Sequence, residues 1–266
     1  MSKPVVLSPA LALGWSLLAT LGLLVGGVAV SVAFGSSNLA LVVGAVLELA
    51  VLLAAARFVV RLYGAGDGPR AFALSAPSAL QLVIGASLGV ILHAPAGYLS
   101  ELVERRFPTP PETLAQQLQA LTPSSTPMAV LMLLAVAGVV PFVEELFFRG
   151  ALFTPLLRSG PALIAVWTTS VAFALAHAEP RNWAPLFLVA LVLGELRRLG
   201  GSIWSCVALH AAFNAATLLY VFVARPVEVK PQGSSWQIAT IGCVLCGLGV
   251  WLFGRVSSRR LAEAQS

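Results

Sequence analysis

Three ionisable side chains stand close together in an otherwise apolar stretch that reads Pro141-Phe-Val-Glu144-Glu145-Leu-Phe-Phe-Arg149-Gly150. Placing a charged side chain at the centre of a membrane costs roughly 2.5–3.5 kcal/mol on insertion scales. Such residues persist where they face a protein interior or a water-filled cavity, and there they mark functional sites. Glu144, Glu145 and Arg149 therefore predict a polar site inside an apolar protein.

The spacing of these three residues predicts a different role for each carboxylate. Glu144 and Glu145 are neighbours, so on a helix they point about 100° apart and do not face one cavity equally. Glu145 and Arg149 stand at i,i+4, which suits an ion pair within the helix. Glu144 is then the carboxylate that remains for chemistry as a general base. The alternative is a charge cluster that only locks helices together.

Two further i,i+4 pairs follow along the chain, Phe173 with His177 and His210 with Asn214. His210 and Asn214 share a helix face and offer two hydrogen-bond donors in one direction, which is what stabilising an oxyanion requires. Together with Glu144 they fit a carboxylate-activated water that attacks an amide, with or without a metal. The alternatives are a packing role for His177 and interhelical hydrogen bonds worth about 0.6 kcal/mol each for the second pair.

The composition places these residues in a membrane protein. The chain has 266 residues, 58% hydrophobic and 10% charged, whereas a soluble domain carries about 25% charged residues. Apolar runs of roughly 20 residues recur, as in helical spans. We expect an all-α polytopic fold, a single transmembrane domain over residues 1–266 whose helices enclose a polar cavity, with a catalytic core at 127–224. Eight helices are predicted, at 9–34, 38–60, 77–98, 127–150, 161–178, 183–197, 202–224 and 235–254.

The distance of each polar residue from the nearest turn, measured along the helix axis, gives a first test of this arrangement. Glu144 lies 16 residues before Gly160 and His177 lies 17 after it, so in an antiparallel pair both stand roughly 24 Å from the turn. His210 lies only about 13 Å from its own turn. This mismatch predicts a bend or a protruding connection, with Pro155 as one candidate for the bend.

The basic residues predict the orientation. An even number of spans puts both termini on one side of the membrane, and the positive-inside rule makes the more basic side cytoplasmic. The side of the termini carries nine basic residues and the other side five. These are Lys3, Arg61, Arg70, Arg158, Arg197, Arg198, Arg255, Arg259 and Arg260 against Arg105, Arg106, Arg181, Arg225 and Lys230. The net charge of +5 thus reflects topology and anionic headgroups, and we expect the lipid bilayer and no nucleic acid as a partner.

Several residues stand apart from these pairs. Ser100–Ser125 is the longest polar stretch and predicts an interfacial loop with a short amphipathic helix. Glu48 is an intramembrane acid that either pairs with an arginine of another helix or lines a cavity. Glu195 could approach the site, although with Arg197 and Arg198 it more simply forms a cytoplasmic helix terminus.

The remaining ionisable and sulfur-bearing candidates have simpler interpretations. His93 lies near the end of a span and is expected at the interface. Cys206, Cys243 and Cys246 lie in apolar runs and are expected to be small buried residues. The first apolar run is too long for a signal peptide and is expected to be a retained span.

The three motifs together resemble those of a known family. Glu144-Glu145-Leu-Phe-Phe-Arg149 resembles the EExxxR motif of the CPBP family, the CAAX-protease and bacteriocin-processing (Abi) intramembrane proteases. Phe173-Ala-Leu-Ala-His177 and His210-Ala-Ala-Phe-Asn214 resemble its second and third motifs, and Gly201-Ser-Ile-Trp204 resembles a GSLW-type stretch common there. The sequence departs from the family pattern at Leu199-Gly200 and at Cys206.

The resemblance implies an intramembrane endopeptidase of glutamic type. Glu144 would activate water, His177 would help position it, and His210 with Asn214 would form the oxyanion hole. Glu145 and Arg149 would hold the first motif in shape, beside Phe173 of the second. A zinc enzyme with Glu144, His177 and His210 as ligands is the alternative, and the form without a cofactor is favoured.

The resemblance leaves the substrate and two other classes of function open. Prenylated CAAX proteins are substrates of eukaryotic relatives, whereas this composition favours a bacterial cytoplasmic membrane. There we expect a membrane-anchored protein or peptide, or a C-terminal sorting segment, as the substrate. A non-catalytic immunity or scaffold protein is one alternative. A transporter is a weaker one, since no inverted repeat is evident.

Overall fold

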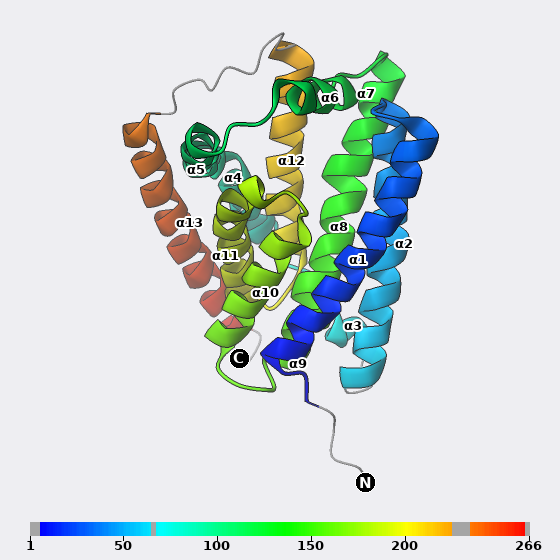
Figure 1. Ribbon diagram of the computed structural model, residues 1–266. Helices are drawn as coiled ribbons and strands as arrows, with labels where there is room; N and C mark the ends of the chain where they lie inside the picture. The colour runs from blue at the N-terminus through cyan, green and yellow to red at the C-terminus, as the bar shows by residue number, and fades with distance from the viewer. Residues whose placement is uncertain (1–5, 65–67, 225–234, 264–266) are drawn as a thin grey trace.

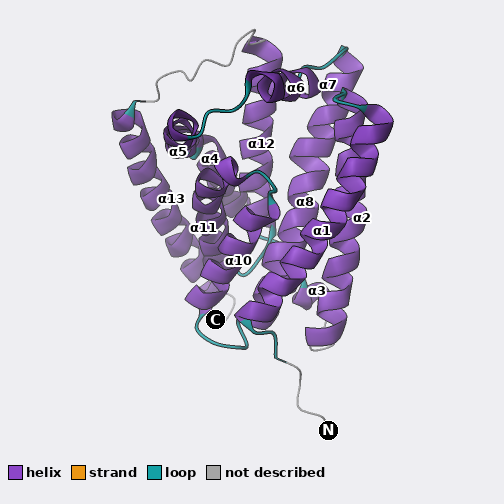
Figure 2. Ribbon diagram, viewed as in Figure 1, coloured by secondary structure: helices purple, strands orange, loops and turns teal. Residues whose placement is uncertain are grey.

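The computed structural model describes residues 6–64, 68–224 and 235–263, and within these residues the chain forms only helices, turns and short connections (Figures 1 and 2). The predicted all-α fold is confirmed. Six helices or continuous helical runs are long and apolar enough to cross a membrane. They are α1 (Pro9–Phe34), α2 (Asn38–Tyr63), α4 with α5 (Ala79–Ile91 and His93–Arg106), the run Thr126–Leu156, α12 (Trp204–Ala224) and α13 (Trp236–Glu263).

Four shorter helices complete the described fold. They are α3 (Gly68–Ala71), α6 (Pro111–Leu121), α10 (Ala162–Ala176) and α11 (Trp183–Gly200), with a single 3-10 turn, η3 (Pro180–Asn182), before the last of them. Helix α6 is the amphipathic helix predicted in the polar stretch, and it lies at the end of the molecule opposite the start of α1 and the end of α13 (Figure 1).

Helices α10 and α11 form a hairpin that does not extend over the full height of the molecule. Helix α10 has 15 residues and rises only about 22 Å, whereas the hydrocarbon core is about 30 Å thick. The turn between α10 and α11 lies near mid-height (Figure 1). The predicted count of eight crossings is therefore not confirmed.

The fourth span is continuous but irregular. It runs as α7 (Thr126–Leu133), η1 (Leu134–Val139), α8 (Val140–Glu145), η2 (Leu146–Leu152) and α9 (Phe153–Leu156), where η1 and η2 are π-helical. Pro141 cannot donate a hydrogen bond to the preceding turn, and it is the second residue of α8, just after the wider turns of η1. Pro155 does not end the helix early, because the helix reaches Leu156. Wider turns of this kind are frequent at functional sites.

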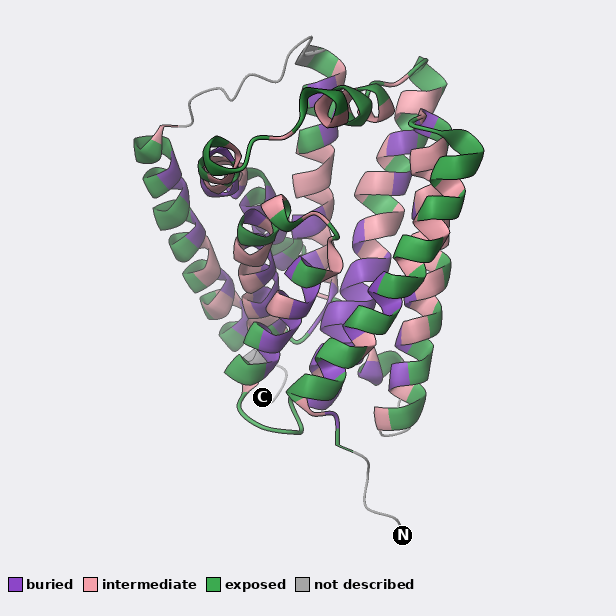
Figure 3. Cartoon of the chain, viewed as in Figure 1, coloured by how far each residue is buried: buried purple, intermediate pink, exposed green. Residues whose placement is uncertain are grey.

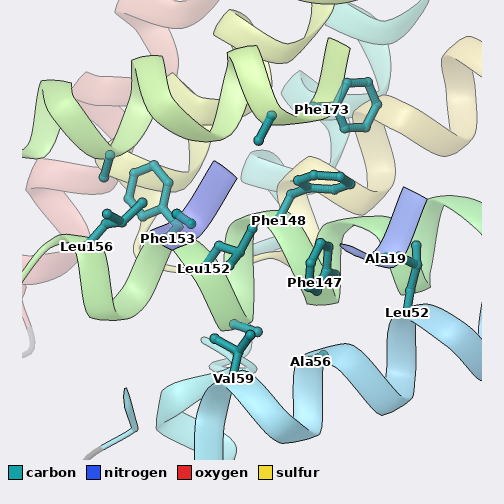
Figure 4. Close-up of a cluster of buried hydrophobic side chains, with 14 of the residues drawn as sticks. Ala19, Leu52, Ala56, Val59, Phe147, Phe148, Leu152, Phe153, Leu156 and Phe173 are labelled. Carbon is teal, nitrogen blue, oxygen red and sulfur yellow. The ribbon is translucent and has the colours of Figure 1, made fainter. Parts of the chain in front are cut away.

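Aromatic and aliphatic side chains fix this irregular span to its neighbours. Phe147, Phe148 and Leu152 project from η2 toward Leu52 of α2 and Phe173 of α10 (Figure 4). All five belong to one buried cluster. Buried residues concentrate at this level of the molecule, while the outer faces of α1 and α13 are exposed, as expected for surfaces in contact with lipid (Figure 3).

Glycines on α4 bring α12 close to the rest of the bundle. A Cβ atom at Gly89 would lie 2.2 Å from the carbonyl oxygen of Leu209, and one at Gly85 would lie 2.6 Å from that of Ser205. Only glycine permits backbones to approach so closely. This contact fixes the depth of α12 one residue before His210.

Candidate active site

The predicted catalytic residues meet at one cavity inside the bundle. The cavity has a volume of about 380 Å³, and its walls come from α1, α2, α8, η2, α10, α11 and α12. Glu144, His177, His210 and Asn214 all line it, among mostly apolar side chains. The structure thus brings together residues that are up to 70 positions apart in the sequence.

Glu144 lies between the two imidazoles. His177 Nε2 is 3.9 Å from Glu144 Oε1, and His210 Nε2 is 3.5 Å from Glu144 Oε2. The expectation that Glu144 and His177 stand at the same depth is confirmed. The Glu144 side chain is buried, and its Oε2 receives no hydrogen bond of good geometry from an N–H or hydroxyl group of the described residues.

His177 is oriented by the end of its own helix. Its Nδ1 lies 2.9 Å from the carbonyl oxygen of Phe173, and because a carbonyl only accepts, Nδ1 is the donor. Nε2 therefore faces Glu144. The backbone leaves the helix at His177, and Trp183 Nε1 donates to the His177 carbonyl over 2.8 Å, which closes the turn.

His210 is oriented by the second carboxylate of the first motif. Its Nδ1 lies 3.0 Å from Glu145 Oε1, and the same oxygen accepts from Arg149 Nη1 at 3.3 Å. Glu145 and Arg149 form the ion pair that their spacing predicted, and both side chains are completely buried. Arg149 Nη2 donates to the carbonyl of Ala190 on α11 at 3.2 Å. This network aims His210 Nε2 at Glu144.

Phe173 packs between the charged groups of this network. Its ring centroid is 5.0 Å from that of His177 and 5.6 Å from that of His210. The guanidinium carbon of Arg149 lies 4.7 Å from the same centroid, a distance at which the ring attracts the cation. Phe173 therefore separates the two imidazoles and covers Arg149.

Asn214 lines the cavity one turn after His210. Its Nδ2 donates to the carbonyl of Val136, in π-helical η1, at 2.9 Å. An amide nitrogen carries two hydrogens, and the described residues take only this one bond from it. The other N–H remains for a ligand in the cavity.

A second cavity of about 450 Å³ adjoins the first. The two share the side chains of His177 and Asn214. His93, Ser100 and Leu121 also line this second cavity, which places it toward α5 and α6. His93, which was expected at the interface, stacks on Phe213 with ring centroids 4.1 Å apart, and its Nε2 lies 3.0 Å from the Phe213 carbonyl.

Two residues of the α11 end differ in their surroundings. Glu195 pairs with Arg198 at 2.6 Å and lines neither cavity. These residues lie in the last turns of α11, which ends at Gly200, and Arg197 is buried there. Arg197 Nε donates to the Arg149 carbonyl at 2.9 Å and Nη2 to Thr154 Oγ1 at 3.1 Å. The carbonyls of the π-helical stretch need donors, and a long basic side chain can reach them.

Glu48 and the three cysteines are the remaining residues whose predicted positions can be compared with the structure. Glu48 lines the first cavity and its carboxyl hydrogen-bonds that of Glu144, which decides between the two roles left open for it. Cys206 and Cys246 are buried as expected, but Cys243 is exposed on α13. An acid in the middle of an apolar span, with no basic residue one turn away, was the signal that could have placed Glu48 at the site.

The zinc alternative requires a set of protein ligands. Among the described residues, no group of three or more His, Cys, Asp or Glu side chains is arranged to hold a metal ion. Glu144, His177 and His210 line one cavity, but they do not form such a group.

Comparison with known proteins gives one match. A family model described as type II CAAX prenyl endopeptidase Rce1-like matches residues 126–216. The match covers about a third of the chain and contains all three motifs. No curated protein and no solved structure matches the chain significantly.

Replacing Arg149 with Met tests how much the buried network contributes to stability. The variant leaves the Glu145 carboxylate buried without its cation, and breaking a buried pair in this way costs about 3–5 kcal/mol. We expect a marked loss in the free energy of unfolding of the purified protein in detergent, measured by thermal or denaturant unfolding. Arg198→Met is the matched control, since its pair with Glu195 is partly exposed and such pairs contribute about 1 kcal/mol or less. Equal stability of the two variants would contradict the assignment.

Proposed function

The chain belongs to the CPBP/CAAX protease family of intramembrane endopeptidases, and from this premise we propose that Glu144 activates a water molecule for attack on a peptide carbonyl. The observation that carries the proposal is the position of this carboxylate between two imidazoles in a mostly apolar cavity. A charged base excluded from bulk water is stronger than the same group in solution, because little solvent screens it.

The geometry supports a short sequence of proton transfers. Glu144 Oε1 and His177 Nε2, 3.9 Å apart, can both bond one water molecule between them. Glu144 takes a proton from this water while the water oxygen attacks the carbonyl carbon. The carbonyl oxygen thereby becomes an oxyanion. The C–N bond then breaks, and the proton passes from Glu144 to the departing amine. The products are a carboxylic acid and an amine, and Glu144 is again a carboxylate.

The oxyanion is stabilised from α12 in this proposal. The free N–H of Asn214 and Nε2 of His210 lie on the same helix face, one turn apart. Because Nδ1 of His210 already donates to Glu145, Nε2 can donate to the oxyanion only when the ring carries both protons. Donors held in place before the reaction need no reorganisation, and one such donor contributes roughly 10²–10³-fold to the rate. Glu145 and Arg149 act indirectly, because they hold the His210 ring through Nδ1.

The shape of the site supports an extended, membrane-anchored substrate. The two cavities meet at His177 and Asn214, so a peptide running through both would pass beside Glu144. Their walls are mostly apolar, which suits a segment that leaves the lipid bilayer. We propose a membrane-anchored protein or peptide, with a C-terminal sorting or anchor segment as the cleaved part.

Replacing Glu144 with Gln tests the chemistry while keeping the size of the side chain. We expect peptide-bond cleavage to fall at least 10²–10⁴-fold, the range attributed to a general base, with similar losses for His177→Ala and His210→Ala. The measurement is terminal-peptide mapping of envelope and secreted proteins in strains that carry each variant. Segments retained only in the variant strains identify the substrates.

Glu195→Gln is the matched control for this experiment, because Glu195 lies outside both cavities and should leave processing unchanged. Normal processing by Glu144→Gln would refute the mechanism. If deletion of the whole protein then still produced a phenotype, a non-catalytic scaffold or immunity role would replace it.

Chelation tests the proposal that no metal takes part. We expect purified protein, incubated with detergent-treated membranes of the deletion strain, to cleave the accumulated substrates at the same rate before and after extended treatment with 1,10-phenanthroline. A water activated by Glu144 alone needs no Lewis acid. Loss of activity that zinc restores would instead establish the zinc-dependent form.

The excess of basic residues on the side of the termini supports a cytoplasmic location for both termini, and we propose the bacterial cytoplasmic membrane. Ser100 and Leu121 line the second cavity, and the helices that carry them, α5 and α6, lie toward the opposite end of the molecule (Figure 1). The cavity would then open toward the outer face of the membrane.

Cysteine labelling in intact cells tests this orientation. In a variant without the three native cysteines, we expect Ser100→Cys to react with an impermeant maleimide. Ser258→Cys, near the end of α13 and also exposed, should react only after permeabilisation. The opposite pattern would place the cavity on the cytoplasmic side.

A further inference from the structure

We propose that Glu48 is a positioning residue for the catalytic base, because its protonated carboxyl group donates a hydrogen bond to the Glu144 carboxylate and holds it toward the water. This inference rests on the proposed function of Glu144. It adds a residue from α2 that lies outside the three motifs and outside the matched residues 126–216.

The packing of α2 places Glu48 at the site. Leu52, Ala56 and Val59 follow Glu48 along one face of the helix, and all three are buried against η2 (Figure 4). Residues at i and i+4 share a helix face, so the face that buries Leu52 also directs Glu48 inward. Glu48 and Leu52 both line the first cavity with Glu144.

The contacts of the two carboxyl groups require a shared proton. Glu48 and Glu144 are hydrogen-bonded to each other through their side chains, and two carboxylates have only acceptors to offer. Two negative charges in hydrogen-bond contact in an apolar site also repel each other strongly. One of the two groups therefore carries a proton.

The charges around the pair place this proton on Glu48. The imidazole nitrogens of His177 and His210 lie 3.9 and 3.5 Å from the Glu144 carboxylate, and Glu145, the like charge beside it, is itself paired with Arg149. The charged or titratable groups that act on Glu48 are Glu144, His177 and His210. No arginine or lysine among the described residues forms an ion pair with Glu48, so the neutral acid is the form that suits its surroundings.

A neutral acid at this position serves the base in two ways. Its O–H satisfies an acceptor of Glu144, whose Oε2 otherwise has no donor of good geometry. The bond also fixes the rotation of the Glu144 carboxylate, so that Oε1 faces His177 and the space for water. Glu48 keeps its own proton throughout hydrolysis, and the protons that move come from water.

Two substitutions separate this role from simple packing. In Glu48→Gln the amide N–H replaces the acid O–H as a donor, whereas Glu48→Leu fills similar space without one. Each purified variant is incubated with detergent-treated membranes of the deletion strain, and the appearance of processed termini is followed from acidic to strongly alkaline pH. At neutral pH we expect Glu48→Gln to stay within about threefold of the wild type and Glu48→Leu to lose on the order of 10–100-fold, the worth of a hydrogen bond to a charged group.

The pH profile supplies a readout that packing would not change. The active form has Glu48 protonated, so activity of the wild type is lost as pH rises and Glu48 gives up its proton. Glu48→Gln cannot lose this proton, and the alkaline decline should disappear. The acidic decline, in which Glu144 takes up a proton and ceases to be a base, should remain in both.

Different results would overturn the role of Glu48 and the proposed function of Glu144. Wild-type activity of Glu48→Leu, equal losses in both Glu48 variants, or an unchanged alkaline decline in Glu48→Gln would overturn the inference. If Glu48→Leu does not fold, judged by its thermal unfolding, the profile of Glu48→Gln decides alone. Full activity of Glu144→Gln would instead refute the proposed function, so the two failures can be told apart.

Discussion

A guanidinium at the centre of a membrane protein must find its hydrogen-bond acceptors within the protein, and the arrangement around Arg149 follows from that need. Its Nη1 pairs with Glu145, its Nη2 donates to Ala190 on α11, and the ring of Phe173 on α10 lies 4.7 Å away. The Arg149 carbonyl in turn accepts from Arg197 of α11. One buried cation thus joins η2 to both helices of the half-depth hairpin.

The hairpin is stable at this depth because the cavity and the protein satisfy its polar turn. Irregular backbone is tolerated within a membrane protein only where it is buried or lines a cavity. Here the His177 carbonyl accepts from Trp183 and His177 Nδ1 donates to the Phe173 carbonyl. The same bonds that satisfy the turn also orient the imidazole toward Glu144, so structural and chemical needs coincide.

Much of this arrangement could be predicted from local patterns, and the parts that could not depend on contacts between helices. Apolar runs gave the limits of α1 and α12 closely, and i,i+4 spacing gave the Glu145–Arg149 pair, because both are properties of a single helix. The burial of Arg197 depends on carbonyls of another helix that a π-helical stretch presents. The inward position of Glu48 depends on the packing of α2 against η2, which the sequence of α2 alone does not contain.

Glu144 and Glu145 show how neighbouring positions with identical side chains come to differ. The helix turns by about 100° between them, which directs Glu145 to the interior of the bundle and Glu144 to the cavity. Glu145 receives a guanidinium and an imidazole N–H as partners, so its charge is compensated within the protein. Glu144 faces two imidazoles at longer distances and one carboxyl group of α2, so its charge is compensated less completely. A carboxylate that is fully paired is a poor base, and one that is held in place but only partly compensated is a good one. The different roles of Glu144 and Glu145 therefore follow from helix geometry together with the groups that the surrounding helices place next to each carboxylate.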